Sequence, residues 1–199
     1  MSDILSSYAI AQYLLVIEPH EALCKEIKQV KKHFADSYDY PAAATGQPNL
    51  TLVKFGQYEI TEQRIIHRLQ LMVAAQASFM VELHDFGSFP THSIFVNVTT
   101  QTQIAELVKS FRPLQHLLKI DKARKPHFIT DPFITIARKL LPWQYEKGWL
   151  EFSHTHFSGR FMADYVLLLR KREGEKRYEM IKKFKMMHVK KDVRQGELF

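Results

Sequence analysis

Two segments of this chain share one pattern and lie 84 residues apart. Residues 48–54 read Pro-Asn-Leu-Thr-Leu-Val-Lys, and residues 132–138 read Pro-Phe-Ile-Thr-Ile-Ala-Arg. Helical and extended patterns on either side of the two segments repeat with the same offset. We therefore predict that an α-β-α-β-β unit occurs twice, over about 18–98 and 101–186 of a single domain spanning 1–199. Such a duplication favours an α+β, two-lobed fold whose antiparallel sheets face a central cleft.

Hydrophobic periodicity predicts the elements of the two units. An apolar run over 12–17 predicts a buried strand before the first unit. Apolar residues that recur every three or four positions predict helices beginning near residues 20, 61, 100 and 142. Short apolar or alternating runs predict strands over 49–55, 79–86, 92–98, 133–137, 161–169 and 178–186. A hairpin turn is predicted at 87–90, and residues 40–47 and 119–125 are predicted to be loops.

Positive charge is concentrated at the C-terminal end of the chain. The whole sequence has 28 Lys and Arg against 21 Asp and Glu, and residues 170–199 hold eleven of the former and five of the latter. This asymmetry indicates either an anionic partner or a solvated basic terminus. We expect 187–199 to form a basic tail, and we expect most of the charge to lie away from the paired threonine segments.

Composition excludes several classes of protein. A single cysteine, Cys24, excludes an intrachain disulfide framework and a thiol-rich zinc site. No apolar run approaches the roughly 20 residues that a membrane-spanning helix needs. The first residues also lack the pattern of a signal peptide. We therefore expect a monomeric, cytoplasmic protein with no membrane association, no metal and no cofactor.

With its paired segments, the chain resembles the two-histidine (2H) phosphoesterase superfamily, which includes RNA 2′-5′ ligase-like proteins and cyclic phosphodiesterases. That family carries two His-x-Thr motifs, typically inside Pro-His-aliphatic-Thr-aliphatic, on strands that line the cleft between two lobes. The segment over 12–27 and the pattern of 161–169 with Tyr178 and Phe184 are also similar to the family. The resemblance implies one histidine acting as general base, the other as general acid, and two threonines that hold the phosphate.

The chain departs from that family at both histidine positions. Asn49 stands at the first position and Phe133 at the second, whereas Thr51 and Thr135 are retained. An asparagine amide does not titrate near neutrality, and phenylalanine has no polar side-chain atom. Each proton transfer of this kind contributes about 10²–10⁴ in rate. The two replacements therefore predict a chain without catalytic residues for the family's reaction.

The retained threonines predict that the cleft still binds a phosphate-containing ligand, an RNA end or a nucleotide. The candidate ligand-binding residues are the four motif residues and one basic residue from each segment: Asn49, Thr51, Phe133, Thr135, Lys54 and Arg138. The ring of Phe133 either stacks on a nucleobase or fills core space, and both alternatives stay open. Strict strand alternation places Lys54 and Arg138 opposite the threonines unless the strands bulge.

Two other functions stay open. One is an active cyclic phosphodiesterase or RNA 2′-5′ ligase-like enzyme with relocated acid and base residues, for which the candidates are His92, His127, His154 and His156. His154 and His156 also offer two metal ligands, but no third ligand stands at a recognisable spacing. The other is a non-catalytic interaction protein that keeps only the scaffold, with a protein partner that the sequence does not identify.

Overall fold

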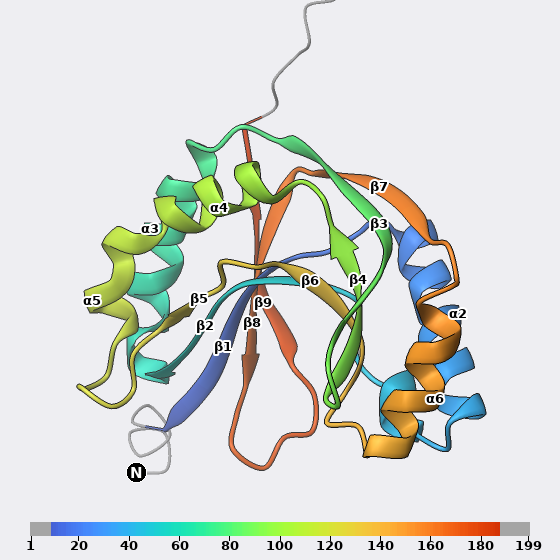
Figure 1. Ribbon diagram of the computed structural model, residues 1–199. Coiled ribbons are helices and arrows are strands. Elements are labelled where there is room, and N and C mark those ends of the chain that lie inside the picture. Colours follow the sequence, from blue (N-terminus) through green and yellow to red (C-terminus); the bar gives the residue numbers. More distant parts are fainter. Residues whose placement is uncertain (1–8, 188–199) are drawn as a thin grey trace, which may run out of the picture.

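The computed structural model of the chain describes residues 9–187, which form two antiparallel β-sheets (Figure 1). The five-stranded sheet has the order β5-β2-β1-β8-β9, and the four-stranded sheet has the order β6-β4-β3-β7. The strands of the five-stranded sheet are β1 (Ile10–Ile17), β2 (Leu50–Tyr58), β5 (His127–Phe128), β8 (Tyr165–Lys171) and β9 (Glu179–Lys185). The strands of the four-stranded sheet are β3 (Phe79–Phe89), β4 (Ser93–Val98), β6 (Phe133–Arg138) and β7 (Ser158–Ala163).

Helices cover one face of each sheet. The five-stranded sheet contacts α3 (Glu62–Ala74), α4 (Gln101–Ser110) and α5 (Gln115–Leu118), whereas the four-stranded sheet contacts α2 (Glu21–Ser37) and α6 (Pro142–Phe152). Three short 3₁₀ turns complete the elements: η1 (Pro41–Ala44), η2 (Glu59–Thr61) and η3 (Arg112–Leu114). Figure 1 shows the two groups of helices on opposite sides of the molecule. The predicted α+β, two-lobed fold with antiparallel sheets is confirmed.

The core packs each sheet against its own helices. Along β1 the residues of the main core alternate, as expected for a strand with one side facing that core: Ala11, Tyr13, Leu15 and Ile17. Beside the four-stranded sheet, the rings of Phe34 on α2 and Phe152 on α6 pack 5.7 Å apart. Gly148 permits this approach of the two helices, because a Cβ atom there would lie 2.7 Å from Cε2 of Phe34.

Each sheet draws strands from both halves of the sequence. The five-stranded sheet combines β1 and β2 with β5, β8 and β9, and the four-stranded sheet combines β3 and β4 with β6 and β7. The halves over about 18–98 and 101–186 therefore do not each form a separate sheet. The duplication itself stays a prediction from the sequence pattern.

The run over 161–169, predicted as one strand, is two strands in different sheets. β7 ends and β8 begins on either side of Asp164. The main core takes odd positions up to Ala163 and even positions, Val166 and Leu168, beyond it. An unbroken apolar run carries no signal for this change of face and of sheet, so the prediction was wrong here.

Three smaller expectations are refined. The predicted loop over 40–47 contains η1. The turn predicted at 87–90 lies later in the chain, because β3 continues to Phe89 and the chain reverses at Thr91, whose φ is +59°. The expected tail over 187–199 begins with a bonded residue, since the N–H of Ser78 donates to the carbonyl oxygen of Met187 at 2.8 Å. The rest of that tail lies outside the described residues. Within residues 9–187, no helix is long and apolar enough to cross a bilayer.

Glu151 of α6 is held by His33 of α2 and by Tyr38, which directly follows α2. Nε2 of His33 lies 2.6 Å from one carboxylate oxygen, and the hydroxyl of Tyr38 donates to the other. The hydrogen bond from Tyr38, with the contact from His33, lowers the pKa of Glu151 below its ordinary value of 4.5. A carboxyl with a lowered folded-state pKa contributes stability above its unfolded pKa, and that stability is lost as the pH falls through the folded pKa.

Glu151→Gln is therefore expected to lower the free energy of unfolding at pH 7, and the deficit should shrink as the pH falls below 4.5. Urea titrations at a series of pH values measure both quantities. Glu26→Gln is the matched control, because Glu26 is an exposed glutamate of α2 with no ion pair among residues 9–187. A deficit of constant size across the pH series would contradict the proposed carboxylate contribution.

Candidate functional site

The first paired segment places Asn49 and Thr51 on one side of the chain at the start of β2. Leu50 and Leu52, between and beyond them, are fully buried on the other side. The hydroxyl of Thr51 donates to Oδ1 of Asn49 at 3.3 Å, and Nδ2 of Asn49 donates to the carbonyl oxygen of Gln47 at 3.1 Å. Both Asn49 and Thr51 are half-buried. The amide of Asn49 therefore orients the hydroxyl of Thr51.

The second paired segment forms β6, in which Phe133 and Thr135 are half-buried and the intervening Ile134 is fully buried. The ring of Phe133 belongs to an aromatic triad with Phe89 of β3 and Phe95 of β4. Ring centroids lie 4.5 Å apart for Phe133 and Phe95, 5.4 Å for Phe133 and Phe89, and 4.9 Å for Phe89 and Phe95. Phe89 is 46% exposed, so the triad is a packed cluster with one edge open to solvent.

Both strands bulge at corresponding positions. In β2, Val16 pairs with Thr51 and Leu15 with Val53, so Leu52 is the extra residue. In β6, Phe95 pairs with Thr135 and Ile94 with Ala137, so Ile136 is the extra residue. A bulge reverses the alternation of side chains beyond it. The two bulges lie at positions related by the same 84-residue offset as the paired segments.

The bulges bring both basic residues to the faces that carry the threonines. In β2, Leu52 and Val53 are both buried, and the next side chain, Lys54, is exposed on the face of Thr51. In β6, Ile136 and Ala137 are both buried, and Arg138 is exposed beyond them. The exception left open in the sequence analysis, a bulge in each strand, therefore applies, and alternation does not turn Lys54 and Arg138 away from the threonines.

The two segments approach each other where the sheets meet. β2 and β6 have Cα atoms within 8 Å of one another, as their neighbouring paths in Figure 1 show. The hydroxyl of Tyr40 donates to the carbonyl oxygen of Arg138 at 2.6 Å. Burial raises the pKa of Tyr178, which precedes β9 of the five-stranded sheet, and the charge of Arg138 opposes that rise. The charge of Arg138 on β6 therefore acts on a residue beside the five-stranded sheet.

The threonine-bearing face of the five-stranded sheet has an apolar centre and basic flanks. Thr51 pairs with Val16, Val16 with Leu167 and Leu167 with Lys183, and directly opposed residues share a face. Val16, Leu167 and Leu169 are buried there as a small cluster, with Leu14 and Tyr178 packed against it. Nζ of Lys183 lies 3.7 Å from the ring centroid of Tyr165.

The basic C-terminal end is divided between the two faces of β8. Lys171 pairs with Gln12, which itself pairs with Gly56, and so lies on the threonine-bearing face. Arg170 and Arg172 turn to the other face, where Glu59, at the start of η2, pairs with both of them. Lys171 and Lys183 thus share the threonine-bearing face, while the expectation that most of the C-terminal charge lies away from the paired segments stays a prediction.

The four candidate histidines are not gathered at one place. His127 pairs with Lys54 across β5 and β2, so it shares the face of Thr51. His92 is exposed at the turn after β3. Nδ1 of His154 lies 2.9 Å from the carbonyl oxygen of Leu150, whereas Nδ1 of His156 lies 3.3 Å from Oδ1 of Asp85. Among residues 9–187, no group of three or more His, Cys, Asp and Glu side chains could hold a metal ion.

A groove of about 420 Å³ extends the threonine-bearing face toward the edge of the sheet. Its lining is mostly polar or basic and comprises Gln12, Lys54, Phe55, Gly56, Arg124, Lys125 and His127. The sequence analysis missed Gln12, Arg124 and Lys125 as site residues, and it named His127 only as a candidate acid or base. The predicted basic loop over 119–125 was the only signal for Arg124 and Lys125, and the neighbouring β5 has two residues and shows no periodicity.

A comparison with models of known families identifies the family of this chain. The family model described as the 2′-5′ RNA ligase superfamily matches residues 19–175. The chain belongs to this superfamily. The match confirms the resemblance to 2H phosphoesterases, while the replacement of the two motif histidines by Asn49 and Phe133 stays a prediction. No curated protein matches the chain.

Solved structures show the same fold at low sequence identity. A crystal structure of a phosphoesterase is 16% identical, with a TM-score of 0.58 over 88% of this chain and 98% of that one. E. coli LigT in its apo form is 17% identical, with a TM-score of 0.58 over 89% and 98%. TT0787 of Thermus thermophilus is 16% identical, with a TM-score of 0.60 over 88% and 97%. E. coli LigT has also been crystallised with 3′-AMP, with phosphate, with NADP⁺ and with ATP.

Proposed function

We propose that this chain is a degenerate 2H phosphoesterase that binds a phosphate-containing ligand, an RNA end or a nucleotide, between its two sheets without two-histidine catalysis. One observation carries the proposal. The paired strands keep Thr51 and Thr135 on the faces opposite their core-facing residues and share a bulge at the same position, yet the family's histidine positions hold Asn49 and Phe133. The framework for holding phosphate is retained, whereas the groups that move protons are absent.

The retained groups suit a phosphate. Hydroxyls of Thr51 and Thr135 donate hydrogen bonds to anionic oxygens, and the bulges add one cation to each threonine, Lys54 and Arg138. Asn49 accepts the hydrogen bond of Thr51 in the structure, and a phosphate oxygen would take its place. Nucleotide and phosphate complexes of E. coli LigT support this chemistry by analogy of fold.

The aromatic triad suits the base of such a ligand. Phe133 occupies the position next to the phosphate-holding Thr135 on the same face, and Phe89 of the triad is 46% exposed. Stacking of a nucleobase on an aromatic side chain contributes about 1–3 kcal/mol and does not depend on base identity. The triad therefore replaces a catalytic group by a binding surface with little base selectivity.

Thr51→Val/Thr135→Val is expected to weaken the binding of 3′-AMP at least about tenfold, since each variant position loses a charge-assisted hydrogen bond. Calorimetric titration at two salt concentrations measures the affinity, which should be saturable and salt-sensitive in the parent. Thr102→Val is the matched control, because Thr102 is an exposed threonine of α4. Unchanged affinity in the double variant would contradict the proposed site, and a parent that binds neither 3′-AMP nor short RNA would favour a non-catalytic interaction protein.

A second candidate is an active cyclic phosphodiesterase or RNA 2′-5′ ligase-like enzyme with a relocated base. One observation favours it: His127 lies on the threonine-bearing face, directly opposite Lys54. Metal-independent hydrolysis of a 2′,3′-cyclic nucleotide by the parent, lost in His127→Asn and retained in His92→Asn, would replace the first proposal by this one.

A further inference from the structure

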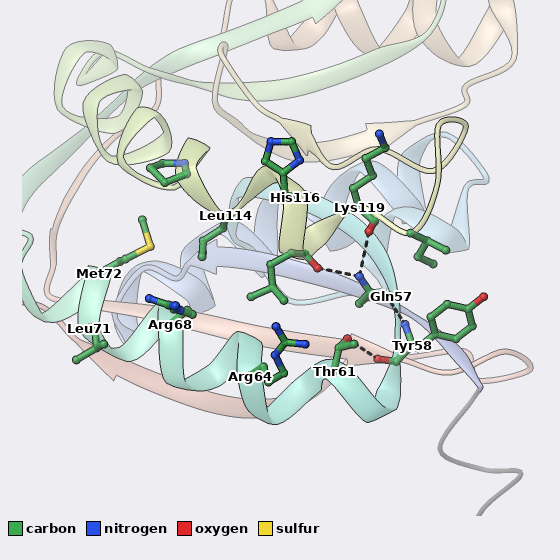
Figure 2. A pocket seen from close by; sticks show the side chains of 13 residues that line it. Gln57, Tyr58, Thr61, Arg64, Arg68, Leu71, Met72, Leu114, His116 and Lys119 are labelled. Carbon is green, nitrogen blue, oxygen red and sulfur yellow. Dashed lines mark hydrogen bonds between the residues drawn. The ribbon is translucent and has the colours of Figure 1, made fainter.

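A second groove lies on the helix-covered side of the five-stranded sheet, away from Thr51 and Lys54. It has a volume of about 760 Å³ and runs between α3 and the segment formed by η3 and α5 (Figure 2). Gln57 of β2, which lines the groove, is buried on the face opposite to Lys54. The groove is therefore separate from the proposed phosphate site, and nothing in the proposed function uses it.

The inner surface of this groove is largely aliphatic. Leu114 and Leu117 line it from the side of η3 and α5, and Met72 lines it from α3. Leu71, also on α3, is 56% exposed at the rim. An exposed leucine beside a concave apolar surface is typical of a binding site for an apolar group.

Two arginines provide the charge of the groove. Arg64 and Arg68 lie one turn apart on α3, and Figure 2 shows both side chains extending from the helix into the space below α5. Neither makes an ion pair within residues 9–187, and no aspartate or glutamate lines the groove. His116 and Lys119 add further basic groups at its upper rim, with side chains turned away from α3 in Figure 2.

The acidic residues nearest to these arginines in the sequence are already paired elsewhere. The guanidinium of Arg170 lies 3.2 Å from Glu59 and 2.9 Å from Glu62, at the N-terminal end of α3. Two neighbouring arginines repel each other, and an anion between them removes that cost. The groove thus combines an apolar wall with an unneutralised pair of guanidinium groups.

The shape of the groove is set before any ligand arrives. The side-chain amide of Gln57 is 4% exposed and donates to the carbonyl oxygens of Leu117 at 2.8 Å and Lys119 at 3.4 Å. Its Oε1 accepts the backbone N–H of Tyr58 at 2.8 Å. These bonds attach α5 to β2 and hold the second wall at a constant distance from the sheet, which lowers the entropic cost of binding.

We propose that this groove binds a small amphipathic anion, with an alkyl or aryl body against the leucines and a phosphate or carboxylate head on Arg64 and Arg68. Planar guanidinium groups bind such heads through two hydrogen bonds each. A small molecule fits better than a partner helix, because the four residues of α5 give a wall only about 6 Å long. The volume falls within the range of roughly 300–1,000 Å³ typical of small-molecule sites.

The test uses n-octyl phosphate below its micellar concentration, added to the full chain and followed by calorimetry. We expect one saturable site, at least about tenfold weaker in Arg64→Gln/Arg68→Gln. Arg160→Gln, at an exposed arginine of β7, is the matched control and should leave the affinity unchanged. Inorganic phosphate and neutral octyl glucoside should each bind more weakly than octyl phosphate, since each lacks one half of the recognised chemistry.

Competition separates this groove from the proposed phosphate site. Octyl phosphate should bind equally well in Thr51→Val/Thr135→Val and in the presence of saturating 3′-AMP. Loss of binding under either condition, or full affinity in the double arginine variant, would overturn the assignment. A third variant, Leu117→Asp, should also weaken binding, and its thermal unfolding curve shows whether the chain is still folded.

Discussion

Restoring histidine at both motif positions, Asn49→His/Phe133→His, is expected to raise the rate of 2′,3′-cyclic nucleotide hydrolysis at least about 10²-fold over the parent. The backbone that would present the two imidazoles is in place, since both positions precede a retained threonine on a bulged strand. One imidazole would then accept a proton from water, and the other would donate one to the leaving oxygen. Steady-state product formation at pH 7, without added metal, measures the gain.

Each half of the change has its own control. Asn49→His alone should give a small gain, because a general base without a general acid supplies only one of two proton transfers. Phe133→His alone also removes a ring from the aromatic triad, so Phe133→Leu measures that loss separately through thermal unfolding and 3′-AMP affinity. Adding Thr51→Val to the double variant should abolish the gain. A folded double variant no faster than the parent would mean that the two positions do not flank a bound phosphate.

The local arrangement of the candidate site could be predicted because it depends on residues close together in the chain. A proline, alternation and a threonine two positions beyond the variable residue were enough to place Asn49 and Thr51 on one side, and the hydrogen bond between them confirms this. The same pattern placed Phe133 beside Thr135. What the pattern did not show is that Phe133 joins Phe89 and Phe95, since that triad depends on the pairing of β6 with β4 and of β4 with β3.

The bulges could not be predicted, and they decide which cations reach the site. Leu52 and Val53 are both buried. In the sequence, the bulge therefore cannot be distinguished from two further apolar residues of a regular strand. For the same reason, Ile136 and Ala137 conceal the second bulge. The charge of the C-terminal end posed a related difficulty, because Lys171 and its neighbours Arg170 and Arg172 act on opposite faces of β8. Net charge alone does not distinguish a cation facing a ligand from one neutralised by a glutamate.

Arg170→Met is expected to lower the free energy of unfolding by about 3 kcal/mol, the low end of the cost of breaking a buried ion pair. The guanidinium of Arg170 lies 2.9 Å from Glu62 and 3.2 Å from Glu59, and all three side chains are only 12% exposed. Methionine keeps the apolar stem and removes the charge, which leaves Glu59 paired with Arg172 and Glu62 without its guanidinium partner. Urea unfolding at pH 7 measures the loss.

The dependence of that loss on pH separates charge from packing. In Arg170→Met, Glu59 and Glu62 lose the guanidinium that both contact, and like-charge repulsion between carboxylates is relieved as the pH falls, so the deficit relative to the parent shrinks. Lys25→Met, which breaks the exposed pair of Lys25 with Glu21, should cost less than about 0.5 kcal/mol. A deficit in Arg170→Met that stays constant between pH 7 and pH 5 would assign the loss to packing of the arginine stem instead. The loss of a hydrocarbon contact does not depend on the protonation of any group.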